Sequence, residues 1–311
     1  MSSFNLESIR TVHLVPLTAY NADGSLNESL QAEHTQRMYA AGIRCYLPAA
    51  GTSEFHSLSA DEIVEIVRIT VEATGPDAVI FAPVGFQVGY AIEVGQRCMA
   101  AGASGIMFMP FGHPYMSDSG ARDYYNQVID AIQAPTLIYK KAPLPTNELL
   151  LEMAKNPHVI GMKYAWNQMH EFRTTVEADT EGVEWLCGSA ERFSPYYMLA
   201  GSNGYTTGAG NICPHITLAK HAAFVAGAYQ EGMDLQSKLL PIEDYRARAG
   251  DSYNISMLKH AMKAFGQDFG PARAPQRQLT ASEEAEIDQL LVPVLQAEEE
   301  IARELANAGI A

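Results

Sequence analysis

The chain has 311 residues, 47% of them hydrophobic, and it carries 36 acidic against 21 basic side chains, for a formal net charge of −15. This length and composition fit one large domain, or one domain with an appendage. The acidic balance argues against a non-specific grip on nucleic acid, so we expect no nucleic-acid partner. An anionic substrate would need a locally positive pocket.

The cysteines and the N-terminal sequence bear on the cellular compartment. The four cysteines are scattered without C-x-x-C spacing, as is typical of small buried side chains in a reducing compartment. The first ten residues, MSSFNLESIR, lack a basic-then-apolar signal pattern. No apolar run approaches the roughly 18 residues that span a bilayer. We therefore expect a cytoplasmic protein with no membrane partner.

Eight short, nearly continuous apolar runs recur along the first two thirds of the chain. They cover residues 11–17, 44–51, 78–85, 105–112, 135–141, 158–165, 183–189 and 204–211. Such runs are typical of parallel strands that are covered on both faces. Segments of helical period separate them, at residues 59–73, 89–103 and 120–134 most clearly. The first of these helices opens with a capping box, Ser59 followed three residues later by Glu62.

This alternation predicts an α/β fold, a (β/α)8 TIM barrel over residues 1–225. Beyond it the strand pattern stops, and residues 222–250, 254–266 and 280–309 have helical periodicity around a Gly/Pro-rich connection at 267–279. We expect a C-terminal all-helical domain over residues 226–311. A doubly wound sheet is the alternative, but its dinucleotide-binding version requires G-x-G-x-x-G after the first strand, and this chain lacks that motif.

The active site of a (β/α)8 barrel lies at the C-terminal ends of the strands, and one lysine lies there in an apolar run. Lys163 is in the sixth run, HVIGMKYA. Apolar surroundings lower the pKa of a lysine, and its neutral amine is a nucleophile toward carbonyl groups. Tyr139 closes the fifth run, and its phenol can relay protons. The alternative is that Lys163 extends to the strand end or pairs with an acid.

Other strand ends carry candidate substrate-binding residues. Gly51, Thr52 and Ser53 form a turn directly after the second run, and its N–H groups and hydroxyls suit a carboxylate. Thr207 lies in the eighth run. The nine histidines include no H-x-H and no H-E-x-x-H, so we expect no metal site. An amine that forms an imine supplies its own electron sink, so no cofactor is expected either.

Several of these segments occur in an order that resembles a known family. The order AGTSE, IY, GMKYA and GYTTGAGNICP is similar to the dihydrodipicolinate synthase / N-acetylneuraminate lyase family, and the likeness extends to ISMLKHAMKAFG and PARAP in the helical tail. The resemblance implies a (β/α)8 barrel with a C-terminal helical domain, a homo-oligomer, and Schiff-base chemistry on pyruvate or a longer 2-oxo acid. It implies that Lys163 forms the imine, that Tyr139 relays protons, and that Thr52 and Ser53 lie in the carboxylate-holding turn.

The turn and the loop after strand four depart from the synthase pattern. Gly51 stands where the synthase carries the first threonine of the turn, and Ser53 stands where it carries a glycine. Gly112 replaces the second of two tyrosines after strand four, and the nearby Tyr115 is the candidate to substitute for that ring. These departures argue against a true dihydrodipicolinate synthase.

The residues after Tyr139 also differ. Lys140 and Lys141 follow it where the synthase has an arginine, and we regard both as candidates for binding a distal anionic or hydroxyl group. The turn GTSEFHSL is closer to the 5-keto-4-deoxyglucarate dehydratase branch, although that branch has Asn-Arg after its tyrosine. The resemblance therefore indicates a divergent member.

The leading hypothesis is a cofactor-independent lyase, an aldolase or a dehydratase, that acts through an imine on Lys163. Its substrate is a 2-oxo acid, either a hydroxylated one of sugar-acid type or pyruvate with an aldehyde. One alternative is a synthase that condenses pyruvate. Another is a catalytically inactive barrel that serves as a ligand-binding or regulatory protein. The expected partners are the small-molecule 2-oxo acid and further copies of the chain, as a tetramer or a dimer.

Overall fold

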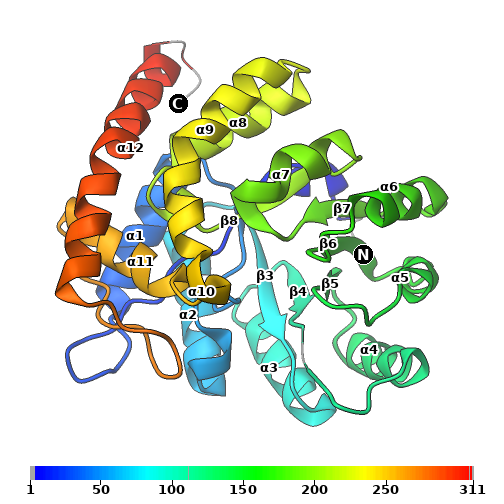
Figure 1. Ribbon diagram of the computed structural model, residues 1–311. Helices are drawn as coiled ribbons and strands as arrows, with labels where there is room; N and C mark the ends of the chain where they lie inside the picture. The colour runs from blue at the N-terminus through cyan, green and yellow to red at the C-terminus, as the bar shows by residue number, and fades with distance from the viewer. Residues whose placement is uncertain (1–3, 111, 308, 310–311) are drawn as a thin grey trace.

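Eight parallel strands close into a barrel in the order of the sequence, with β8 hydrogen-bonded to β1. The strands are β1 (Val12–Leu14), β2 (Cys45–Tyr46), β3 (Val79–Val84), β4 (Gly105–Phe108), β5 (Thr136–Lys140), β6 (Val159–Tyr164), β7 (Glu184–Cys187) and β8 (Gly204–Thr207). The computed structural model describes residues 4–110, 112–307 and 309. Outside these ranges lie residue 111, which belongs to the fourth predicted strand, and the outermost residues of both predicted domains. The predicted (β/α)8 TIM barrel is confirmed (Figure 1).

Helices separate the strands and cover the outside of the barrel. They are α1 (Glu28–Ala40), α2 (Ala60–Ala73), α3 (Val88–Ala100), α4 (Asp118–Ile132), α5 (Asn147–Met153), α6 (Met169–Ala178), α7 (Ala190–Leu199) and α8 (Pro214–Val225). Short 3₁₀ helices are η1 (Leu6–Ile9), η2 (Phe55–Ser57) and η3 (Ala209–Asn211). The side chains of Asn27, Ser59, Ser117 and Thr146 cap α1, α2, α4 and α5, because each accepts an N–H group of the first turn. The predicted capping box of Ser59 and Glu62 is confirmed.

A helical segment follows the barrel. It consists of α9 (Tyr229–Arg246), the kinked single turn α10 (Arg248–Asp251), α11 (Asn254–Ala261), η4 (Met262–Phe265) and α12 (Ala281–Asn307). In Figure 1, α9 runs inward from the periphery and ends at α10, and α12 lies along the outer side. One hydrophobic cluster joins α9, α11 and α12 to α8 and to Leu17 and Ala19 of the barrel. A division into separate domains at residue 225 stays a prediction.

The structure corrects the predicted lengths of several elements. Most strands are shorter than the apolar runs, since β1 ends at Leu14 and β8 ends at Thr207 ahead of η3. An apolar run contains buried loop residues as well as strand residues, and periodicity cannot separate the two. The helical stretch at 222–250 is not continuous, because α8 ends at Val225 and Gly227, with φ of 75°, forms the turn before α9. No helix among the described ranges is long and apolar enough to cross a membrane.

Candidate active site

A cavity of about 370 Å³ lies at the C-terminal ends of the strands. Its walls come from the turn after β2, from β5 and β6, from the loops after β7 and β8, and from the helical segment. The lining includes Gly51, Thr52, Tyr139, Lys141, Lys163, Asn167, Ser189, Arg192, Thr207, Arg246, Asp251, Asn254 and Gln276. The structure therefore brings together six of the predicted site residues, which lie far apart in the sequence. They are Gly51, Thr52, Tyr139, Lys141, Lys163 and Thr207.

Lys163 and Tyr139 are register partners on neighbouring strands, and both face this cavity. The Lys163 Nζ atom lies 4.1 Å from the centroid of the Tyr139 ring. Only 4% of Lys163 is exposed, and burial, assisted by the positive charge of Lys141, lowers its pKa to about 7. Within the described ranges, no carboxylate pairs with Lys163, and neither its amine nor the Tyr139 hydroxyl has a hydrogen-bond partner. Both reactive groups are thus available to a ligand.

Two glycines set the space around Lys163. A Cβ atom on Gly188 would lie 2.9 Å from Lys163 Cγ and 3.2 Å from Tyr139 Cε2, so only glycine fits beside the pair. A Cβ atom on Gly161 would lie 2.8 Å from the carbonyl oxygen of Glu184 on β7. Gly161 therefore serves the packing of the strands, whereas Gly188 serves the position of the lysine.

The turn after β2 contains unused backbone donors beside the cavity. Among the residues that the structure describes, no acceptor takes the N–H groups of Thr52 and Ser53. The Ser53 hydroxyl instead donates to the carbonyl oxygen of Pro16, and the Ser53 carbonyl accepts from Thr18 Oγ1 at 2.7 Å. Consecutive free N–H groups suit an anion. Thr52 lines the cavity, whereas Ser53 is fully buried and does not line it. The Ser53 hydroxyl ties the turn to the loop after β1.

The two lysines after Tyr139 have different surroundings. Lys141 is exposed and lines the cavity. Lys140 points the other way, as alternation along a strand requires, and its Nζ donates to the carbonyl oxygens of Pro143 at 2.8 Å and Pro145 at 2.5 Å. Burial lowers the pKa of Lys140 to about 8. Lys140 does not line the cavity of Lys163.

The remaining predicted residues are Thr207 and Tyr115. Thr207 lines the cavity, but its hydroxyl donates to Glu191 and accepts from the N–H group of Gly210 at 2.7 Å. Its hydroxyl is therefore engaged within the protein. Tyr115 is 88% exposed and does not line the cavity. Within this chain it does not reach Lys163.

Sequence reasoning missed several residues of the outer part of the cavity. Asn167 accepts from Ser189 Oγ at 2.6 Å and from the Tyr197 hydroxyl at 3.0 Å, in the loops after β6 and β7. Asp251, Asn254 and Gln276 come from the helical segment, and Arg246 donates to Asn254 Oδ1 at 2.7 Å. Asn167 lies four residues after Lys163 and could have been found from that closeness, whereas no local pattern signals the helical-segment residues.

The described part of the chain contains no group of three or more His, Cys, Asp or Glu side chains arranged to hold a metal ion. Besides Lys163, whose amine has a lowered pKa, the cationic side chains in the cavity are Lys141, Arg192 and Arg246, against the acidic Glu243 and Asp251. The cavity is therefore locally positive in a chain whose net charge is −15.

A family model described as the dihydrodipicolinate synthetase family matches residues 8–293. The chain belongs to this family. A solved dihydrodipicolinate synthase from Bacillus clausii, of this same fold, is 31% identical, with a TM-score of 0.88 and coverage of 92% of this chain and 98% of that one. The family membership agrees with the resemblance that the motifs indicate.

The curated relatives of this family member include dehydratases. A probable 5-dehydro-4-deoxyglucarate dehydratase of Ralstonia nicotianae is 28% identical over 287 residues, 90% of this chain and 91% of the relative. The 5-dehydro-4-deoxyglucarate dehydratase of Pseudomonas putida is 26% identical over 298 residues, 94% of this chain and 98% of the relative. A sialic acid aldolase of Ruminococcus gnavus, solved as a catalytic lysine mutant, is 18% identical with a TM-score of 0.87 and coverage of 96% and 99%, which shows the fold alone. These names describe lyases, and the protein is a lyase.

Proposed function

We propose that the protein is a Schiff-base lyase that acts on a hydroxylated 2-oxo acid of sugar-acid type through an imine on Lys163. The observation that carries the proposal is the Lys163 amine, which is buried in the cavity, has no acidic partner among the described residues and has a pKa of about 7. At neutral pH a substantial fraction of this amine is neutral and nucleophilic.

The reaction begins when the amine adds to the 2-oxo carbon, and loss of one water leaves an iminium ion. Burial raises the pKa of Tyr139, so its hydroxyl stays protonated at neutral pH and can donate a proton to the departing oxygen. The N–H groups of Thr52 and Ser53 hold the substrate carboxylate beside the amine. Hydrolysis of the final imine returns the free Lys163.

Two outcomes share this iminium. In a dehydratase, loss of a proton from C3 gives an enamine, and its electron pair expels the C4 hydroxyl, which leaves as water. In an aldolase, the C4 hydroxyl loses its proton, the C3–C4 bond breaks toward the iminium, and an aldehyde departs from the pyruvate enamine. The curated relatives named as dehydratases favour the first outcome.

The outer cavity supports a hydroxylated substrate. Asn167, Ser189, Asn254 and Gln276 place neutral hydrogen-bonding side chains there, and such groups suit hydroxyls. Lys141 lies at the same cavity and supplies a positive charge for a distal anionic group. A pyruvate-condensing synthase is the second candidate, supported by the 31% identical synthase of Bacillus clausii.

The test is chemical trapping. The protein is incubated with pyruvate and sodium borohydride, and the intact mass is measured for the wild type and for Lys163→Ala. We expect a reduced adduct of one pyruvate per chain in the wild type and none in the variant. No adduct with pyruvate or with any 2-oxo sugar acid would refute the Schiff-base function and favour an inactive barrel. With a 2-oxo sugar acid as substrate, release of pyruvate then indicates an aldolase, and a product that has lost one water indicates a dehydratase.

We further propose that the protein is a cytoplasmic homo-oligomer, a tetramer or a dimer. All four cysteines are buried and free, which fits a reducing compartment. An exposed aromatic cluster supports self-association: Phe86 is 41% exposed, stacks on Phe55 and meets His56 and Tyr90 edge-on. Light scattering after gel filtration would give the subunit count, and a monomer at all concentrations would contradict the assembly.

A further inference from the structure

A buried ion pair lies behind the turn that faces the 2-oxo acid site. Lys259 on α11 places Nζ 2.7 Å from Glu54 Oε1, and only 4% of the lysine side chain and none of the glutamate side chain is exposed. The second oxygen, Glu54 Oε2, accepts the backbone N–H of Arg273 at 2.7 Å. Both carboxylate oxygens of the last residue of the turn are therefore held by the helical segment. Neither Lys259 nor Glu54 lines the cavity of Lys163.

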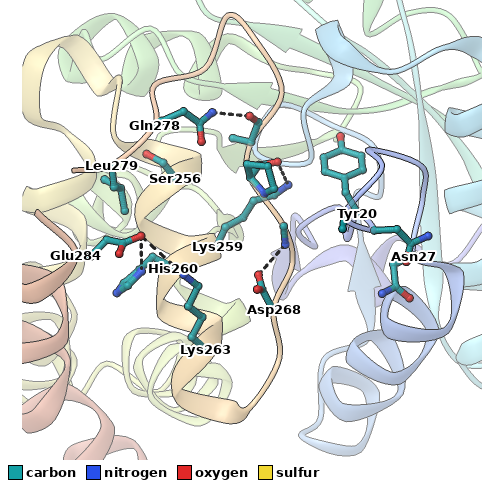
Figure 2. Close-up of a pocket in the computed structure, with 15 residues that line it drawn as sticks. Tyr20, Asn27, Ser256, Lys259, His260, Lys263, Asp268, Gln278, Leu279 and Glu284 are labelled. Carbon is teal, nitrogen blue, oxygen red and sulfur yellow. Dashed lines mark hydrogen bonds and ion pairs between the residues drawn. The ribbon is translucent and has the colours of Figure 1, made fainter. Parts of the chain in front are cut away.

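Neighbouring side chains direct Lys259 toward Glu54. It lines a second cavity, of about 510 Å³, between the loop after β1 and the helical segment, and Figure 2 shows its side chain extending from α11 toward Tyr20. Its Nζ atom lies 4.0 Å from the centroid of the Tyr20 ring, and Arg273 Cζ lies 4.2 Å from the same centroid. Lys263 borders the same cavity but is directed to Glu284, at 3.7 Å (Figure 2). The two lysines thus form a natural pair of test and control.

The backbone of the turn needs such support. Glu54 has φ of 69° and ψ of 33°, in the left-handed region that residues other than glycine rarely adopt. Its N–H group donates to the carbonyl oxygen of Gly51 at 3.1 Å, which closes the turn over Thr52 and Ser53. A change of conformation at Glu54 would therefore reorient the free N–H groups of Thr52, which lines the cavity, and of its neighbour Ser53.

We propose that Lys259 is a positioning residue for the 2-oxo acid site: by holding Glu54 it fixes the turn from Gly51 to Glu54 so that the N–H groups of Thr52 and Ser53 meet the substrate carboxylate. The inference rests on the proposed function, since it assigns a remote residue to the carboxylate end of that same site. It also gives a role to the segments around Lys259 and Arg273, which lie outside the barrel.

The experiment measures the pyruvate concentration that gives half-maximal borohydride trapping. Lys259→Met should raise this concentration about ten-fold or more, because small displacements of binding groups are costly. Lys263→Met, the matched control, should change it by less than about two-fold, since it removes only a half-exposed ion pair. Lys259→Arg keeps the charge and should recover part of the loss.

A second ligand separates positioning from general damage. Methyl pyruvate has the same ketone but no carboxylate charge, so its half-saturating concentration should change little in Lys259→Met. An equal rise for both ligands, or wild-type values for pyruvate, would overturn the positioning role. If Lys259→Met does not fold, Glu54→Gln removes the same ion pair. The results expected of it, and those that would overturn the proposal, are the same as for Lys259→Met. Trapping in the wild type without an effect of these variants would leave the proposed function standing, whereas no trapping in the wild type would remove both.

Discussion

The reactivity that we propose for the Lys163 amine depends on its surroundings in the barrel. Burial lowers its pKa to about 7, and the positive charge of Lys141 acts in the same direction. Below that pH the amine is protonated and cannot attack a carbonyl, and above it the amine is neutral. The reactive fraction of Lys163 should therefore rise with pH across the neutral range.

This predicts a pH profile for imine formation. The rate of pyruvate trapping in the wild type should rise from pH about 6 to pH about 8, with a midpoint near the lowered pKa. Lys141→Gln removes a neighbouring positive charge, so the pKa of Lys163 should rise and the midpoint should move to higher pH. Lys140→Gln is the control, because that ammonium points to Pro143 and Pro145. A midpoint that is the same in all three proteins would contradict the role of Lys141.

Gly188 offers a second test at a single residue. Gly188→Ala would place a methyl group 2.9 Å from Lys163 Cγ, so the lysine or Tyr139 must move. A displacement of this kind should slow trapping about 100-fold, because the amine leaves its productive position. Gly112→Ala is the control, since no other described atom lies within 4 Å of the added Cβ. Equal trapping rates in both variants would show that the geometry around Lys163 is not limiting.

Residue patterns anticipated part of the site. The alternation of a strand places Tyr139 and Lys163 inside and Lys140 outside, so the sequence contained the correction for Lys140. The roles of the Ser53 hydroxyl and Gly188 depend on atoms from the loop after β1 and from β5 and β6, and no local pattern carries that information. Tyr115 was inferred from a position in a loop, and the loop places it at the surface.

At the scale of elements, the buried carboxylate of Glu298 is one of the contacts that fasten the helical segment to the barrel. Glu298 on α12 accepts the N–H groups of His215 at 2.9 Å and Ile216 at 3.0 Å, which open α8, and it contacts His215 Nδ1 at 2.7 Å. A negative charge at a helix N-terminus is stabilising because it satisfies free N–H groups and the helix dipole. Glu298 thus joins the last helix to the last barrel helix.

This contact predicts a loss of stability. Glu298→Ala should lower the free energy of unfolding by about 2 kcal/mol, the effect of losing a well-formed cap. Urea denaturation followed by circular dichroism would measure it. The exposed neighbour offers the comparison: Glu299→Ala should change the free energy by less than about 0.5 kcal/mol. Equal midpoints for both variants would show that the Glu298 contact does not stabilise the fold.

The elements themselves were largely predictable, and their ends were not. Apolar runs of strand length identified all eight strands in order, and the Ser59 capping box marked the start of α2. The break between α8 and α9 was missed, although Gly227 lies there, because Ala226 and Ala228 on its two sides continue the helical pattern.

At the scale of the molecule, the cavity is a joint product of the barrel and the helical segment. The strands supply Tyr139 and Lys163, while Asp251, Asn254 and Gln276 arrive from beyond residue 246. Asp251 and Asn254 follow the end of α9, whereas Gln276 comes from the connection between η4 and α12. Long-range packing of this kind leaves no trace in periodicity. The positive lining also explains how an acidic protein can attract an anionic substrate.

The most direct test of this account asks which lysine carries the trapped pyruvate. Lys140, Lys220 and Lys259 are also buried, and burial lowers the pKa of each to about 8. The wild-type protein is trapped with pyruvate and borohydride, digested with a protease that does not cut at lysine, and mapped by tandem mass spectrometry. We expect a single adduct, on Lys163. An adduct on another lysine, or one that persists in Lys163→Ala, would contradict it.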